Sequence, residues 1–171
     1  MTKLRKKPGL APLVAVLALV AFGGAAAFAQ RQLAGRPEVK VNLAGSLERG
    51  GRRLALAEVE NVQPGEILEW QIVSLNEGTG AAREYKAVGR IPAGTAFVAG
   101  SAEGEAGSVV TYSIDGGKTF SSQPIVEEKQ PDGTVKRVPA PASMYTEVRY
   151  EWSDALAAGG KLTASYRVRV K

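Results

Sequence analysis

The chain has 171 residues and contains neither cysteine nor histidine. These two absences exclude disulfide bonds, thiolate or Ser-His-Asp catalysis, and zinc sites of the ordinary kind. The 22 lysines and arginines exceed the 17 acids and give a formal charge of +5, a balance that by itself would suit a nucleic-acid partner.

The N-terminal segment has the parts of a signal peptide. A basic stretch at residues 3–7 precedes an apolar run at residues 10–22, and Ala27 and Ala29 are the small residues of an A-x-A cleavage site. We therefore expect a helical signal segment that is cleaved after Ala29, which makes Gln30 the new N-terminus.

An uncleaved membrane anchor is the alternative for the same segment, because residues 8–29 carry no charge and approach the length of a membrane helix. In both cases the basic end stays in the cytoplasm and the remainder is exported. We expect the protein in the periplasm, at the cell surface or in the medium. Any contact with a membrane is expected only through this segment, if it is uncleaved.

Loss of the signal segment also changes the charge. Four of the 22 basic residues lie within residues 1–29, so 18 remain against 17 acids, and the net charge falls to +1. The apparent basicity therefore belongs to the targeting segment, and we expect no nucleic-acid partner.

After Ala29, apolar and polar residues alternate with a period of two, which is typical of β-strands. No later segment repeats apolar residues at helical spacing over three turns. Segments of this kind lie, in chain order, near residues 39–43, 54–59, 68–74, 85–88, 97–98, 109–114, 119–120, 125–126, 135–138, 148–152 and 162–170. Turn sequences separate them, with hairpins expected at Asp115-Gly116 and Asp132-Gly133. We predict eight or nine short strands in a single all-β antiparallel sandwich domain over residues 30–171.

Several segments carry a family resemblance. Residues 68–78 read LEWQIVSLNEG, residues 91–102 read IPAGTAFVAGSA, and residues 110–120 read VTYSIDGGKTF. With the closing segments 145–150 and 156–170, they resemble in order the conserved-repeat domain of prokaryotic surface proteins, catalogued as domain of unknown function number eleven. The resemblance implies an immunoglobulin-like sandwich over about residues 60–171, used in secreted and envelope proteins and without catalytic residues. This chain departs from the family at Gly89, where Asp is common, and at Ser74, where an apolar residue is usual.

Two pairs of acids are the remaining candidates for chemistry. Glu103 and Glu105 lie in a glycine-rich loop, and Glu127 and Glu128 are adjacent. A carboxylate pair that cleaves glycosides needs a fixed separation on a rigid scaffold, so we interpret both pairs as solvated surface charge. We expect no enzyme, no catalytic, cofactor-binding or metal-binding residue, and no cofactor.

The function predicted from these features is that of an exported structural or adaptor module. Val39, Val41 and Leu43 alternate on an N-terminal strand that could pair with the sheet edge of an envelope or surface protein, or of a second copy. The other interpretation is that they complete their own sheet. A carbohydrate- or peptide-binding module that uses the loop at residues 123–144 is the alternative function.

Overall fold

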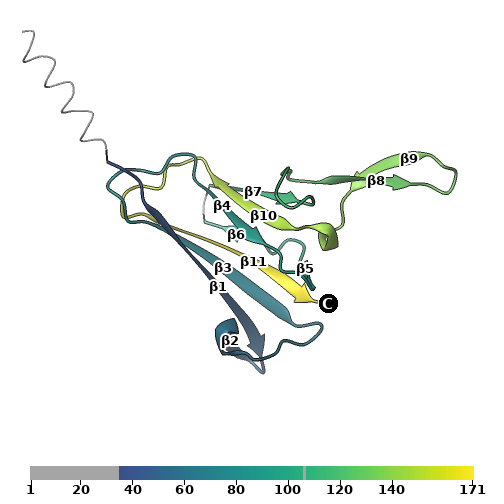
Figure 1. Cartoon of the computed structure of the whole chain (residues 1–171), viewed down its shortest axis with the longest axis horizontal. Helices are drawn as coiled ribbons and strands as arrows, with labels where there is room; N and C mark the ends of the chain where they lie inside the picture. Colours follow the sequence, from purple (N-terminus) through teal and green to yellow (C-terminus); the bar gives the residue numbers. More distant parts are fainter. Residues whose placement is uncertain (1–34, 106) are drawn as a thin grey trace, which may run out of the picture. The chain divides into compact units, whose positions relative to one another are not determined.

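The computed structural model of the chain describes residues 35–105 and 107–171, and residues 36–171 form one compact unit (Figure 1). The predicted signal segment and its cleavage residues Ala27, Ala29 and Gln30 lie outside the described residues. Within the described part, no helix is long and apolar enough to cross a membrane. Strands dominate that part, and its helices are two 3-10 turns of three residues each. The all-β prediction is therefore confirmed.

The strands and 3-10 helices follow one another with short connections. Their bounds are β1 Val39–Arg49, β2 Arg52–Ala55, η1 Leu56–Glu58, β3 Ile67–Asn76, β4 Lys86–Arg90, β5 Thr95–Phe97, β6 Glu103–Gly104, β7 Ser108–Ser113, β8 Ile125–Lys129, β9 Val135–Pro139, η2 Ala142–Met144, β10 Glu147–Trp152 and β11 Lys161–Val170.

The paired strands are antiparallel and form two facing sheets (Figure 1). The first sheet has the order β2-β1-β3-β11-β5, with β6 also paired to β11, and the second has the order β4-β10-β7. Strands β8 and β9 pair only with each other. The last two strands, β10 and β11, show the clearest alternation in the sequence, and they lie in opposite sheets.

The hydrophobic core lies between the inner faces of the two sheets. Leu68 and Ile72 on β3 and Val168 on β11 pack against the cluster that contains Val148 and Tyr150 on β10, and each of these side chains is at most 5% exposed. Their side chains all point toward the other sheet, as the alternation of apolar and polar residues along each strand predicts. Burial of large aliphatic and aromatic side chains from both sheets is the main force that holds the sheets together.

Two tyrosines also join the sheets by hydrogen bonds. Tyr150 on β10 donates to the carbonyl of Ser165 on β11, and Tyr166 on β11 donates to the carbonyl of Arg90 on β4, both at 2.6 Å. Burial raises the pKa of both phenols, so the hydroxyl groups stay protonated and remain donors. Each ring therefore combines apolar burial with a satisfied polar end.

The two predicted hairpin turns differ in outcome. At the first, Gly116 and Gly117 have positive φ angles of 72° and 84°, but beyond the turn only Ser121 pairs with Tyr112, by a single bridge. The expected return strand at residues 119–120 is therefore wrong. The turn at Asp132-Gly133 is confirmed, with φ 85° at Gly133 and β8 and β9 on either side.

The carboxylate of Asp115 explains why the first hairpin stays short. It accepts hydrogen bonds from the Thr119 hydroxyl at 2.7 Å and from the amides of Lys118 and Thr119 at 3.1 and 3.0 Å. The Ser113 hydroxyl donates to it as well, at 2.7 Å. These bonds engage backbone groups that a longer ladder would need.

Acid should loosen this turn. Hydrogen bonds from Thr119, and then from Ser113, hold the pKa of Asp115 below its ordinary value of 3.8. A lowered pKa in the folded protein stabilises the fold above pH 3.8, and this contribution is lost as the pH falls below that value. The urea midpoint of the wild type should therefore exceed that of Asp115→Asn at neutral pH, and the difference should shrink below pH 3.8. A difference that does not change with pH would contradict the charge-based explanation.

Candidate interaction surfaces

The outer edge of β1 is an unpaired strand edge. Toward the sheet interior, β1 pairs with β3 in the register Val41↔Ser74 and Leu43↔Ile72, so the strand does complete its own sheet on that side. On the other side, β2 pairs only with residues 46–49. Among the described residues, none pairs with β1 on this side over residues 39–45.

The direction of the backbone groups along β1 follows from one hydrogen bond. The amide of Glu77 donates to the carbonyl of Glu38 at 2.8 Å, which makes 38↔77 a hydrogen-bonded pair. Because hydrogen-bonded and non-hydrogen-bonded pairs alternate in an antiparallel ladder, the even residues of β1 bond to β3. The amides and carbonyls of Val39, Val41, Leu43 and Gly45 therefore point outward at the open edge.

The same edge exposes apolar side chains. Val41 is 57% exposed and Leu43 is 51% exposed, although their partners on β3, Ser74 and Ile72, are 1% and 2% exposed. Paired residues lie on the same face of a sheet, so Val41 and Leu43 are on the inner face of the first sheet. At Val41 and Leu43 the cover given by the second sheet thus ends between β3 and β1, whereas Leu47, farther along β1, is 2% exposed and belongs to the core. Val39, the third residue of the predicted surface, is half-buried.

A second open edge lies on β4, and it differs in charge. Strand β4 pairs only with β10 among the described strands. Lys86 and Arg90 lie at its two ends and form ion pairs with Glu151 and Glu147. Charged side chains on an edge strand hinder pairing with another strand. The segment from Val41 to Gly45 carries no charged residue at all.

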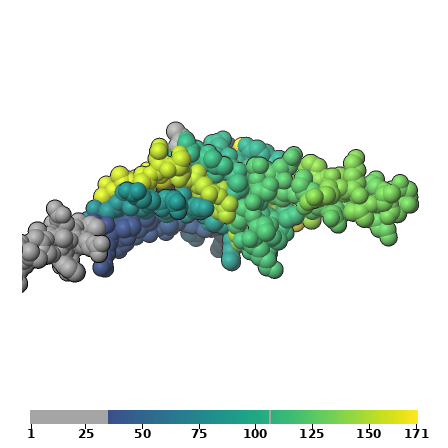
Figure 2. All heavy atoms as spheres, turned by 90° about the horizontal axis from the view of Figure 1, so that it is seen from above, coloured from purple at the N-terminus to yellow at the C-terminus, as the bar shows by residue number. Residues whose placement is uncertain are grey.

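The loop at residues 123–144 contains the β8–β9 hairpin, which extends beyond the two sheets (Figures 1 and 2). Its base is fixed by a hydrogen bond from the Ala140 amide to the Pro124 carbonyl at 2.8 Å, and both residues are buried. Toward the tip, Glu127 lies opposite Arg137 and Glu128 lies opposite Lys136. Opposite charges across the strands stabilise such a ribbon, and both of its outer edges are unpaired within the described part of the chain.

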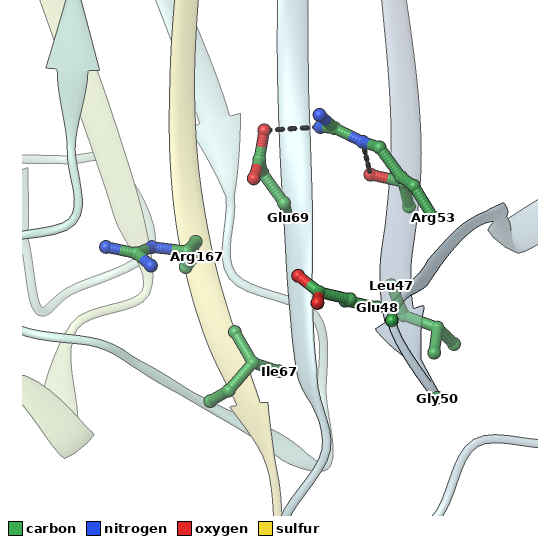
Figure 3. Close-up of a pocket in the computed structure, with 9 residues that line it drawn as sticks. Leu47, Glu48, Gly50, Arg53, Ile67, Glu69 and Arg167 are labelled. Carbon is green, nitrogen blue, oxygen red and sulfur yellow. Dashed lines mark hydrogen bonds and ion pairs between the residues drawn. The ribbon is translucent and has the colours of Figure 1, made fainter.

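An open hollow of about 600 Å³ lies on the outer face of the first sheet (Figure 3). Arg53 pairs with Glu69 at 2.5 Å and donates to the Ser46 hydroxyl at 2.9 Å. Figure 3 shows the Arg167 guanidinium directed away from that pair. The hollow combines both signs of charge and suits a polar ligand more than an apolar one. No sequence pattern predicted this hollow, since its residues come from β1, the turn after it, β2, β3 and β11.

The predicted acid pairs do not form a site. Glu127 and Glu128 are neighbours on β8 and both are exposed, so their side chains point to opposite faces of the hairpin. Glu103 and Glu105 are exposed in and beside β6. Among the described residues, no group of three or more acids, histidines or cysteines is placed to hold a metal ion.

Comparison with known proteins finds no matching family model, no matching curated protein and no matching solved structure.

Proposed function

We propose that this protein is a non-catalytic module that is exported from the cytoplasm and acts through protein contacts, as a structural or adaptor component of the cell envelope or of the secreted fraction. The proposal includes a cleaved signal peptide over residues 1–29. It also includes strand pairing as the mode of contact, either with an envelope or surface protein or with a second copy.

The observation that carries the proposal is the set of unpaired strand edges. The outer edge of β1 over residues 39–45 and both outer edges of the β8–β9 hairpin have no partner strand within the described part of the chain. Backbone groups on such edges bind an added strand with main-chain hydrogen bonds, and neighbouring side chains supply specificity. The chain also lacks histidine and cysteine, which removes the commonest catalytic bases and nucleophiles from consideration.

The family assignment is part of the same proposal. The resemblance of residues 60–171 to the conserved-repeat domain of prokaryotic surface proteins supports an immunoglobulin-like sandwich. In an immunoglobulin domain the last two strands share a sheet, whereas β10 and β11 lie in opposite sheets here. The proposed likeness therefore concerns the two facing antiparallel sheets and not that strand order.

The test is to tag the full chain at its C-terminus, express it in the producing cell and cross-link the exported fraction. We expect a protein with the mass of a chain that begins at Gln30, cross-linked to an envelope component. A full-length chain that remains in the cytoplasm would contradict the proposal. So would turnover of an envelope substrate that a single carboxylate substitution abolishes.

Shortening the hairpin should reduce the capture of that component by about tenfold or more if the hairpin is the contact. Replacement of residues 127–137 by Asn-Gly leaves Val126 opposite Val138 across a two-residue turn. The matched control is the double variant Glu127→Arg with Arg137→Glu, which keeps opposite charges face to face. Equal loss of capture in the shortened variant and in the charge-swapped variant would indicate that the partner recognises the charges of the hairpin. Unchanged capture in both variants would assign the contact to another surface.

A carbohydrate- or peptide-binding module is the second candidate, because the hairpin at residues 123–144 is exposed on both faces. Retention of a glycan or a peptide by the wild type, and its loss in the shortened variant, would favour this candidate over the adaptor role.

A further inference from the structure

We propose that an extended segment of a partner protein adds a fourth strand to the second sheet, along the free edge of β4 and over the uncovered inner face of β1. The inference rests on the proposed function, because it names the site and the chemistry of one contact that such a module would make. The expected segment carries an acid between two large apolar residues.

The first sheet extends beyond the second sheet at β1. Strand β10 lies over β11, whose backbone the Tyr150 hydroxyl reaches. The start of β4 lies over β3, where Tyr85, directly before β4, donates to the Ser74 hydroxyl at 2.8 Å. Among the described strands, the second sheet ends at β4, whereas the first sheet continues from β3 to β1. Since packed sheets keep their strands roughly aligned, a strand added beside the start of β4 would lie over β1.

The part of β1 that such a strand would cover is apolar. Val41 and Leu43 lie on the inner face and are more than half exposed. Farther along the same face, η1 already supplies cover, because a Cβ atom on Gly45 would meet the Leu56 side chain. Only the Val41 and Leu43 side chains therefore lack cover on this face, and their burial would favour binding of a strand with apolar residues.

The backbone of the β4 edge is ready to accept a strand. The amide of Trp152 donates to the carbonyl of Tyr85 at 3.2 Å, which makes 85↔152 a hydrogen-bonded pair of the β4–β10 ladder. Because the two kinds of pair alternate, the odd residues of β4 bond to β10. Lys86, Val88 and Arg90 therefore direct their amides and carbonyls toward the open edge.

The fold limits this edge at both ends. At one end, Glu84 has a φ angle of 52° and departs from the extended conformation. At the other end, the Arg90 carbonyl already accepts a hydrogen bond from the Tyr166 hydroxyl. The pairing thus spans residues 85–90, with complete hydrogen-bonded pairs at Lys86 and Val88.

The charges of the edge favour an acidic segment. Strands β4, β10 and β7 together carry Lys86, Arg90 and Arg149 against Glu147 and Glu151. Lys86 and Arg149 share Glu151, at 3.0 and 2.5 Å, and the Arg90 side chain remains 88% exposed beside Glu147. Such charges hinder pairing with an ordinary strand, so they select a segment that brings an acid to Lys86.

The positions of the partner's side chains follow from the ladder. Paired residues lie on the same face, so the residues opposite Tyr85 and Ala87 point inward, toward Val41 and Leu43. The residue opposite Lys86 lies between them and points outward. The pattern that fits is therefore Leu-Glu-Leu, with leucine as a large apolar residue and glutamate as the acid.

A short peptide tests this pattern. The sequence Glu-Ala-Val-Leu-Glu-Leu-Val-Ala-Glu reads the same in both directions and so fits either strand direction. Titrated with the full chain and followed by fluorescence anisotropy, the labelled peptide should bind with a dissociation constant below about 1 mM. A peptide with serine in place of both leucines should bind about tenfold more weakly or worse. Absence of binding, or equal binding of the two peptides, would overturn the inference.

A charge swap tests the register at Lys86. Lys86→Glu should weaken binding of the peptide by about tenfold, and a peptide with lysine in place of the central glutamate should bind Lys86→Glu better than it binds the wild type. This gain also shows that the variant is folded. Lys136→Glu, a change on the exposed strand β9, is the matched control and should leave binding unchanged. Equal weakening by both variants, or no gain with the swapped peptide, would contradict the assignment.

A charge on the inner face tests the position over β1. Leu43→Glu should weaken binding by about tenfold or more, because a carboxylate would replace the apolar contact. Val109→Glu should not, although Val109 is 60% exposed on β7 against 51% for Leu43. Weakening by Leu43→Glu without any effect of Lys86→Glu would place the peptide on the edge of β1 and overturn the inference. Self-association of the chain that the peptide displaces would assign the site to a second copy and overturn it as well.

The two proposals fail separately. Capture of an envelope component by Lys86→Glu and Leu43→Glu as efficiently as by the wild type would leave the proposed function standing and reject the β4 site. Peptide binding that follows Lys86 and Leu43, with an exported fraction that captures nothing, would support the site and reject the adaptor role.

Discussion

Replacement of Gly89 by alanine should lower the free energy of unfolding by about 2–3 kcal/mol, although alanine in a strand is usually more favourable than glycine. Gly89 lies on the inner face of β4, opposite Val148. A Cβ atom there would lie 2.9 Å from Cζ of Tyr166 and closer still to Cε1. The ring cannot move away easily, because it is 1% exposed and its hydroxyl is bonded to the Arg90 carbonyl.

A second substitution separates this clash from an effect of alanine itself. In a Tyr166→Leu background, Gly89→Ala should cost less than about 0.5 kcal/mol, and the difference is the coupling free energy of a double-mutant cycle. Urea unfolding of the four proteins measures it. The same small cost of Gly89→Ala in both backgrounds would show that the ring is not the obstacle.

Asn76→Ala should destabilise the protein by about 3–5 kcal/mol, a large part of the stability of an ordinary domain. The side chain is fully buried and makes five hydrogen bonds. Its Nδ2 group donates to three carbonyls and its Oδ1 accepts from two amides. The partners are the carbonyls of Gly80, Leu156 and Ala157 and the amides of Glu38 and Gly78. Loss of the amide removes a partner from the Glu38 and Gly78 amides and from the Gly80 carbonyl, whereas the carbonyls of Leu156 and Ala157 keep the amides of Ala82 and Gly160.

The readout for Asn76→Ala is thermal or urea unfolding together with amide exchange. Exchange should increase at residues 77–80 and 156–160, which Asn76 connects, and should change little in the β8–β9 hairpin. Asn42→Ala is the matched control, because Asn42 is exposed on β1, and it should change stability by less than about 0.5 kcal/mol. Similar losses in the two variants would contradict a special role for Asn76.

The sequence predicted the strands well where alternation is long. The segments at 68–74, 148–152 and 162–170 all lie within strands, β3, β10 and β11. Alternation is a local property, because neighbouring side chains of a strand always point to opposite faces. Short elements were harder to predict. Strand β6 has two residues, the segment at 54–59 became the end of β2 followed by η1, and the strand expected at 119–120 did not form.

The candidate surfaces were predictable only in part. Val39, Val41 and Leu43 were correctly placed on a strand, but their alternation did not indicate which of them would be covered. In the sequence, Ser74 stands at a strand position where an apolar residue is usual. In the structure it is buried and accepts a hydrogen bond from the Tyr85 hydroxyl at 2.8 Å. The hollow beside Arg53 could not be predicted, because it combines residues that are distant in sequence.

Residue types and near neighbours in the chain are enough to predict the strand-forming periodicity, the glycine turns and the absence of cysteine and histidine chemistry. Only the tertiary structure shows that the Tyr166 ring leaves no room for a Cβ atom at Gly89 and that the buried Asn76 side chain hydrogen-bonds three separate segments. It also shows that the outer edge of β1 has no partner strand over residues 39–45 within the described part of the chain. These features depend on which distant strand lies opposite a residue, and the second sheet covers β1 at Leu47 but not at Val41 and Leu43.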